Sequence, residues 1–192
     1  MTWLVAGLGN PGDRYANTRH NVGRMVAAEL AHRAGERFKK VRFLPVEAAE
    51  MRQGVDKVLL ASSTRFMNES GPSYASLANK HEVESERVIA VYDELDIAAG
   101  ELRVKLGGGS SHNGVKSLQQ ALRGRSFLHV RVGIGRPPGR QDPADFVLQP
   151  IGSKLETDVA IWVDRAADAV MSLITDGLGA TQDRFNRQPP PG

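Results

Sequence analysis

Hydrophobic residues along the chain follow two spacings, and each spacing predicts a different kind of element. Short apolar runs predict buried strands, and the clearest lie at Trp3–Ala6, Lys57–Ala61 and Val88–Tyr92. Apolar positions that alternate with polar ones predict more exposed strands, which lie at Leu102–Leu106 and Leu128–Gly135. Weaker strand patterns occupy Val41–Val46 and Ala48–Arg52.

Apolar residues at intervals of three and four predict amphipathic helices. They cover Val22–Ala34, Asn113–Leu122 and Ser153–Asp176, with a shorter helix at Thr181–Asn186 and another that begins near Ser70. Asn17 or Thr18 is the expected N-cap of the first helix, and Gly35 marks its expected end. Pro72 suits the first turn of the helix that Ser70 caps.

Strands that alternate with helices predict an α/β fold, with a twisted mixed sheet flanked by helices. A length of 192 residues fits a single domain, which we assign to residues 1–187. The proline-rich end, Gln188–Gly192, is expected to be a disordered tail.

The composition narrows the classes of function. The chain has no cysteine, which excludes disulfides, zinc–thiolate sites and thiol nucleophiles. Its 25 basic and 22 acidic residues leave a net charge of only +3, which allows a local basic patch but does not by itself indicate a polyanionic partner. The first residues lack a basic region followed by a long apolar one, so no signal peptide is expected, and no apolar run is long enough to span a membrane. We therefore expect a soluble, cytoplasmic protein.

The glycines in the sequence GLGNPG, residues 7–12, match the G-x-G-x-x-G pattern of dinucleotide-binding turns. Such a turn needs its third glycine at a helix start and a carboxylate at the end of the next strand. Here the helical pattern begins only near Asn21, and about twenty residues after the glycines Glu29 lies inside a helix. The glycine pattern therefore lacks the helix start and the strand-end carboxylate of a dinucleotide-binding turn. A nucleotide-dependent oxidoreductase is the less favoured alternative.

Polar side chains lie where predicted strands end or helices begin. They are Asn10, His20, Asn68, Asp93 and Asn113. Because ligands of α/β sheets bind beyond the carboxyl ends of the strands, these loops are expected to meet in one crevice.

The chemistry of these side chains suits hydrolysis. His20 is a candidate general base, and Asp93 is a candidate to hold one of its ring nitrogens. The asparagine amides can donate hydrogen bonds to an oxyanion or carbonyl. With no thiol and no serine in a nucleophile motif, water is the expected nucleophile.

Simpler interpretations stay open from the pattern alone. A histidine and an asparagine near a helix start are more often caps. The residues Asp93–Asp96 after a strand, taken alone, more often form a solvated turn. His112 and His129 lack metal-ligand spacing to any partner. The three glycines at 107–109 form either a flexible turn or a loop that lets a phosphate approach backbone amides.

Several motifs in order resemble the bacterial-type peptidyl-tRNA hydrolase family. They are GLGNPGDRYANTRHNVG at 7–23, FMNESG at 66–71, YDELD at 92–96, HNGVKS at 112–117 and VRVGIGRP at 130–137. The resemblance covers residues 3 to 187 and implies hydrolysis of the ester between a peptide and the 3′-terminal ribose of tRNA. It also implies a monomer that works without a metal or another cofactor and needs no obligate protein partner.

The resemblance implies a role for each matching residue. His20 matches the base that activates water, Asp93 the aspartate that orients it, and Asn10 the asparagine that separates N-blocked peptidyl-tRNA from free aminoacyl-tRNA. The residues that match the lining for the peptidyl-adenosine end are Tyr15, Phe66, Asn68 and Asn113. Lys105 matches a lysine that grips tRNA phosphate.

Two parts of the sequence depart from the family pattern. Ser110 and Ser111 stand where the family often has two glycines, which predicts a stiffer loop. His129 stands where the family tends to have an arginine, so we expect phosphate binding to depend more on Lys105, Arg103 and Arg131. A non-catalytic RNA-binding module is the second alternative to the esterase. The joint presence of His20, Asp93, Asn10 and Asn68 argues against it.

Overall fold

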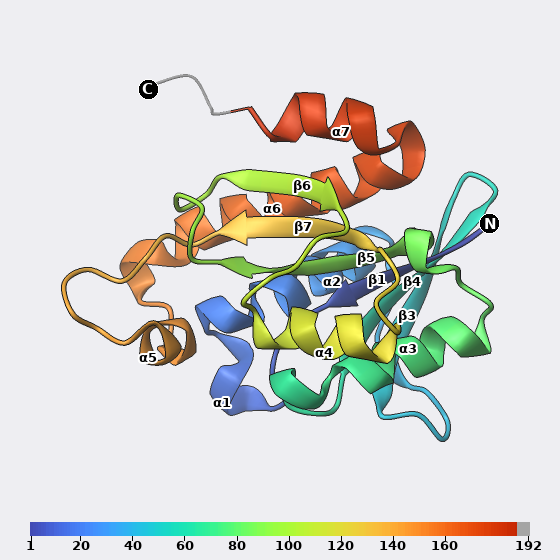
Figure 1. Cartoon of the computed structure of the whole chain (residues 1–192), viewed down its shortest axis with the longest axis horizontal. Helices are drawn as coiled ribbons and strands as arrows, with labels where there is room; N and C mark the ends of the chain where they lie inside the picture. Colours follow the sequence, from blue (N-terminus) through green and yellow to red (C-terminus); the bar gives the residue numbers. More distant parts are fainter. Residues whose placement is uncertain (188–192) are drawn as a thin grey trace.

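A seven-stranded mixed sheet forms the centre of the molecule (Figure 1). The computed structural model describes residues 1–187, and the predicted tail at 188–192 lies outside the described residues. The strands are β1 Thr2–Gly7, β2 Lys39–Lys40, β3 Val46–Gln53, β4 Asp56–Ser63, β5 Val88–Glu94, β6 Leu102–Leu106 and β7 Leu128–Gly133. They are arranged in the order β2-β3-β4-β1-β5-β7-β6. The neighbours β4, β1, β5 and β7 run parallel, whereas β3 is antiparallel to β4, β2 to β3 and β6 to β7.

Helices cover both faces of this sheet (Figure 1). The α-helices are α1 Asp13–Ala16, α2 Val22–Arg33, α3 Gly71–Lys80, α4 Asn113–Ala121, α5 Pro143–Leu148, α6 Ser153–Asp176 and α7 Leu178–Phe185. Three short 3-10 turns are η1 Arg19–Asn21, η2 Met67–Glu69 and η3 Ser85–Arg87. One apolar cluster joins α2 and α6 to one face, and a second joins α3 and α4 to the other. Within residues 1–187, every helix is too short or too polar to cross a lipid bilayer.

The start of α2 packs directly against the sheet because Gly23 has no side chain. A Cβ at this position would lie 2.0 Å from the carbonyl oxygen of Val91 in β5. Any larger residue would push the helix away from the strand. This close approach holds η1, which directly precedes α2, beside the carboxyl end of β5.

Strand β6 lies at one edge of the sheet, and α7 covers this edge. Asn186, just after α7, accepts a hydrogen bond from the Val104 N–H at 2.7 Å and donates one to the Val104 carbonyl at 3.0 Å. Gln182 donates a second bond to that carbonyl at 3.1 Å. Side-chain amides thus take the place of a neighbouring strand, which protects the edge from pairing with another chain.

The predicted α/β class and mixed sheet are confirmed, and β6 and α6 have the predicted bounds. The strand predicted at Val41–Val46 is wrong, because this segment turns between β2 and β3 and Phe43 adopts a φ of 65°. The N-cap prediction for the first long helix is also wrong. Asn17 ends α1, Thr18 precedes η1, and Asn21 occupies the cap position of α2.

The prediction that β7 is half exposed is wrong at His129, whose exposed fraction is 0%. Its ring stacks on Phe127 with centroids 4.5 Å apart, and its Nδ1 lies 2.8 Å from the Tyr92 hydroxyl. Burial, with the nearby charges of Lys105 and Arg131, lowers the pKa of His129 to about 3. The neighbouring strands and α4 cover this face, which alternation within one strand does not reveal.

The buried His129 predicts a loss of stability on mild acidification. Because the pKa of His129 is near 3 when folded and 6.5 in an unfolded chain, the unfolded state binds the extra proton between these values. His129 should therefore lower the free energy of unfolding by about 2 kcal/mol between pH 6.5 and 4.5. Urea unfolding at both pH values measures this loss, which should be much smaller in His129→Gln.

The matched control is His32→Gln, which removes an exposed histidine from α2. This control should lose as much stability as the wild type between the two pH values. An equal loss in His129→Gln and wild type would contradict the assignment to His129.

Candidate active site

A cavity of about 500 Å³ opens at the carboxyl ends of β1 and β5. Six of the residues singled out from the sequence line it: Asn10, His20, Phe66, Asn68, Asp93 and Asn113. Helix α5 supplies a further wall through Pro143, Ala144, Val147 and Leu148. The expectation that the polar loops meet in one crevice is therefore confirmed for these residues.

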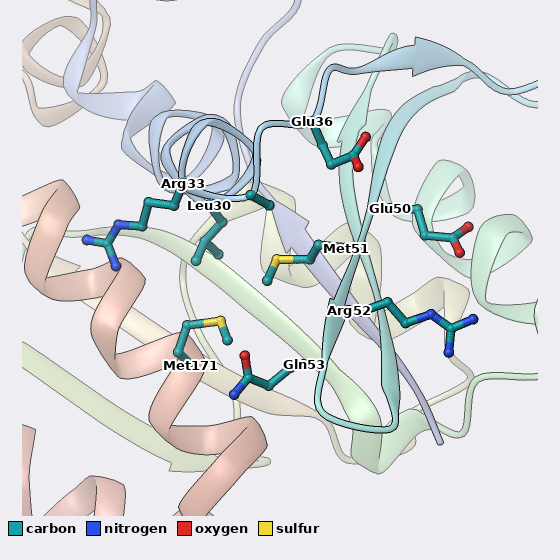
Figure 2. A pocket seen from close by; sticks show the side chains of 9 residues that line it. Leu30, Arg33, Glu36, Glu50, Met51, Arg52, Gln53 and Met171 are labelled. Carbon is teal, nitrogen blue, oxygen red and sulfur yellow. The ribbon is translucent and has the colours of Figure 1, made fainter.

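A second cavity of about 790 Å³ lies elsewhere, between α2, β3 and α6 (Figure 2). Leu30, Met51 and Met171 give it an apolar floor. Arg33, one of the arginines that line it, forms ion pairs with Glu29, Asp164 and Asp168. Since its lining contains no histidine, it offers no base that titrates near pH 7.

The carboxylate of Asp93 lies between two imidazoles. His20 Nδ1 is 2.9 Å from Oδ2 and 3.1 Å from Oδ1, and His112 Nε2 is 2.8 Å from Oδ1. The two rings lie 4.9 Å apart between centroids. Asp93 is the sixth residue of β5 rather than a residue after the strand, so its backbone is fixed by the sheet. The prediction of a solvated turn at this position is therefore wrong.

The hydrogen bonds assign the protons on both rings. His112 Nδ1 accepts a hydrogen bond from the Gly114 N–H at 3.1 Å at the start of α4. Its proton therefore resides on Nε2 and points at Asp93. His20 donates through Nδ1 to the same carboxylate, which leaves its Nε2 as the acceptor at the cavity.

Two opposing effects act on Asp93, which is only 3% exposed. Burial by itself would raise the pKa of its carboxyl, but the charges of His112 and His20 and their hydrogen bonds hold it well below the usual value. Asp93 is consequently an anion throughout the neutral range and accepts hydrogen bonds from both imidazoles.

The sequence interpretation missed His112, which it set aside for lack of metal-ligand spacing. The fold supplies partners that spacing along the chain could not, because Asp93 comes from β5 and His112 from the loop before α4. The available signal was its position directly before Asn113. Ligand atoms of His20, Asp93 and His112 lie within 4.8 Å of one another. A metal ion could bind them only by displacing both N–H···O bonds.

A reciprocal amide pair fixes Asn10. Its backbone N–H donates to Asn21 Oδ1 at 2.8 Å, and Asn21 Nδ2 donates to its carbonyl at 2.9 Å. The side-chain oxygen of Asn10 accepts from the Met67 N–H at 2.8 Å. The NH₂ group of Asn10 is thereby left as the donor for a ligand in the cavity.

The other predicted binding residues lie around the cavity rather than in it. The ring of Tyr15 meets the ring of Phe66 edge-on, with centroids 6.2 Å apart. Lys105 and Arg131 do not line the cavity in the described part of the chain. Lys105 Nζ donates to the Gly109 carbonyl at 3.1 Å, and burial together with the charge of Arg131 lowers its pKa.

Lys105 and Arg131 nevertheless belong to one face of the sheet. The register pairs Arg103 with Arg131 and Lys105 with His129, so these side chains share a face of β6 and β7. His129 is buried beneath them and does not reach a phosphate. In the loop before α4, Ser110 Oγ accepts from the His112 N–H at 3.1 Å, a restraint that a glycine would not provide.

Comparisons with known proteins agree on one family. A sequence model of the family described as Peptidyl-tRNA hydrolase matches residues 4–191. The chain is 49% identical over 185 residues to the peptidyl-tRNA hydrolase of Frankia casuarinae, covering 96% of this chain and 93% of that protein. It is 48% identical over 190 residues to that of Streptomyces coelicolor, covering 96% and 94%. The solved peptidyl-tRNA hydrolase from Acinetobacter baumannii is 29% identical, with a TM-score of 0.89 over 99% of this chain and 97% of that one.

The two histidines are predicted to hold opposite tautomers. Nitrogen-15 NMR of the imidazoles near pH 7.5 should show a proton on Nδ1 of His20 and on Nε2 of His112. The physical reason is that each ring donates to Asp93 through a different nitrogen. The same tautomer on both rings would contradict this arrangement, and Asp93→Asn should change both signals.

Proposed function

As a member of the peptidyl-tRNA hydrolase family, the chain hydrolyses peptidyl-tRNA, and we propose that His20 is the general base that activates the attacking water. The observation that carries this assignment is the Asp93 carboxylate, which holds His20 Nδ1 at 2.9 Å and leaves Nε2 to accept a proton at the cavity. A neutral histidine held by a carboxylate is suited to this role near pH 7.

The reaction then proceeds in two steps. His20 Nε2 takes a proton from water as the water oxygen attacks the ester carbonyl carbon, and Asp93 stabilises the imidazolium that forms. We expect the amide groups of Asn10, Asn68 and Asn113, which line the cavity, to donate to the oxygen that becomes negative. Collapse of the tetrahedral intermediate breaks the bond to the ribose oxygen. His20 returns the proton to that oxygen, and the peptide leaves as a carboxylic acid, which then loses its remaining proton to solvent.

His112 has a positioning role in this scheme. Its Nε2 holds one oxygen of Asp93 at 2.8 Å, which fixes the carboxylate plane that His20 meets. Tyr92 packs behind it, with ring centroids 5.0 Å apart. Asp93, which orients His20, is therefore itself held in place by His112.

The remaining residues recognise the two halves of the substrate. Asn10 distinguishes an N-blocked peptide from a free amine, and Tyr15 and Phe66 stack at the terminal adenosine, as in the family that the sequence resembles. Single-stranded RNA ends are read by such stacking. Lys105 and Arg131 contact phosphates of the acceptor stem. The enzyme is expected to work in the cytoplasm as a monomer.

Replacing His20 tests the catalytic assignment. His20→Ala should lower kcat on N-acetyl-aminoacyl-tRNA by at least about 100-fold, while tRNA affinity stays within a few-fold of the wild type. Asp93→Asn should lower kcat with little change in KM, since it acts on the transition state. Ester cleavage followed under single-turnover conditions measures both.

His32→Ala on α2 is the matched control and should retain full activity. If His20→Ala kept more than about a tenth of the wild-type kcat, His20 would not be the base. Wild-type protein that binds tRNA but cleaves neither blocked nor free aminoacyl-tRNA would instead be a non-catalytic RNA-binding module.

Replacing Lys105 tests the phosphate contact. Lys105→Ala should weaken tRNA binding and reduce the slope of log affinity against log salt concentration by about 1. The exposed Lys154→Ala on α6 serves as the control for a general change of charge. Slopes that are equal in wild type and Lys105→Ala would exclude a phosphate contact at this lysine.

A further inference from the structure

The two parts of the sequence that depart from the family pattern meet at one buried side chain, Tyr92. Its hydroxyl lies 2.8 Å from Nδ1 of His129, the residue that stands in place of an arginine. Burial raises the pKa of Tyr92, and the charge of Arg131 and a hydrogen bond from Ser110 oppose this rise. Ser110 and His129 are therefore neighbours of the same hydroxyl, although they come from a loop and from β7.

The hydroxyl of Tyr92 donates its proton to His129. A buried O–H group is nearly always paired with an acceptor, and His129 Nδ1 is the acceptor at hydrogen-bond distance. Burial lowers the pKa of His129 to about 3, so its ring is neutral near pH 7 and accepts through one nitrogen. An arginine carries only donors and could not take this proton. The type of side chain at position 129 therefore decides whether the hydroxyl is held.

His129 is a rigid anchor for this bond. Its backbone belongs to β7, its side chain is fully buried, and its ring stacks on Phe127. Its Nε2 finds no partner within residues 1–187. Since an unpaired buried polar atom costs free energy, a histidine is less favourable here than an apolar side chain, except for the bond that it makes to Tyr92.

Tyr92 in turn supports His112 at two points. The two rings pack with centroids 5.0 Å apart. Ser110, which bonds to the hydroxyl of Tyr92, also accepts from the His112 N–H at 3.1 Å. The loop that leads to His112 needs such support, because the three glycines at 107–109 have no side chains to restrain it. His112 then holds Asp93 Oδ1 at 2.8 Å.

We propose that Ser110 and His129 are positioning residues for the hydrolysis. Together they fix Tyr92, which keeps the ring of His112 aligned with the Asp93 carboxylate. Neither residue lines the active-site cavity, so both act through Tyr92 rather than on the substrate. This inference rests on the proposed catalytic role of the Asp93 carboxylate.

Tyr92→Phe tests this support, because it removes the hydroxyl and keeps the ring beside His112. We expect kcat on N-acetyl-aminoacyl-tRNA to fall about two- to tenfold, the effect of one lost hydrogen bond, with KM within about twofold of the wild type. Nitrogen-15 NMR of the free protein near pH 7.5 should show His112 as an average of two tautomers instead of one. An unchanged kcat or an unchanged His112 spectrum would overturn the inference.

The matched control is Tyr74→Phe. Tyr74 is as buried as Tyr92 and belongs to the same apolar cluster, but its hydroxyl donates to the Gly7 carbonyl at 2.9 Å. This variant should lose thermal stability as Tyr92→Phe does, while kcat and the His112 spectrum stay as in the wild type. Equal changes of the His112 spectrum in both variants would show a general loss of packing and overturn the inference.

Two replacements of His129 test the acceptor itself. His129→Leu has no acceptor and should reproduce Tyr92→Phe, and the double variant should lower kcat no further, because both changes remove the same bond. His129→Asn offers a side-chain oxygen near the position of Nδ1 and should restore most of kcat and the single tautomer of His112. An asparagine variant no better than the leucine variant, at equal thermal stability, would contradict the role of His129.

Ser110→Ala tests the other support of the loop. It should lower kcat about two- to tenfold and shift the His112 signals in the same direction as Tyr92→Phe. Wild-type kcat and signals in this variant would contradict the role of Ser110. The spectrum is recorded without substrate, so a failure of this inference leaves the assignment of the base untouched. Conversely, His20→Ala tests the base without changing Ser110 or His129.

Discussion

The geometry of the active site depends on one buried anion and the two rings that compensate it. A carboxylate removed from water loses several kcal/mol of solvation unless donors replace the lost water. Asp93 receives three short contacts from His20 and His112, and in return both rings are oriented by the same group. The hydrogen bonds that compensate the buried charge therefore also fix the orientation of His20 and His112.

The fold makes this interaction possible by bringing three distant segments to the carboxyl ends of the central strands. Asp93 is held in the middle of the sheet by β5, and the close contact at Gly23 brings η1 to the strand. His112 is fixed by the first turn of α4, where Gly114 donates to its ring. Each segment contributes a side chain from a backbone that is already hydrogen-bonded, so little conformational entropy is lost when substrate binds.

Much of this arrangement could be predicted from single residues and local periodicity. The long amphipathic helix α6 and the alternating strand β6 can be predicted from local sequence alone. Each directs one face toward the core, so its apolar residues recur at a regular spacing. Asn10, His20 and Asp93 could be singled out because chemistry at strand ends is expected to converge. His112 and His129 could not, since what matters for both is a partner or a cover from elsewhere in the chain. The turn at residues 41–45 could not be predicted either. Its apolar residues follow a strand pattern, but Phe43 adopts a φ of 65°, which a strand does not allow.

The hydrogen bonds between Asn186 and Val104 form late when the chain folds during its synthesis. The two residues are separated by 82 positions, which take roughly 4 to 16 s to translate at about 5–20 residues per second. During that interval the outer edge of β6 has no cover from α7, while β5 and β6 have already been made. Nascent chains on neighbouring ribosomes can therefore pair through their β6 edges until Gln182 and Asn186 have been synthesised and bond to Val104.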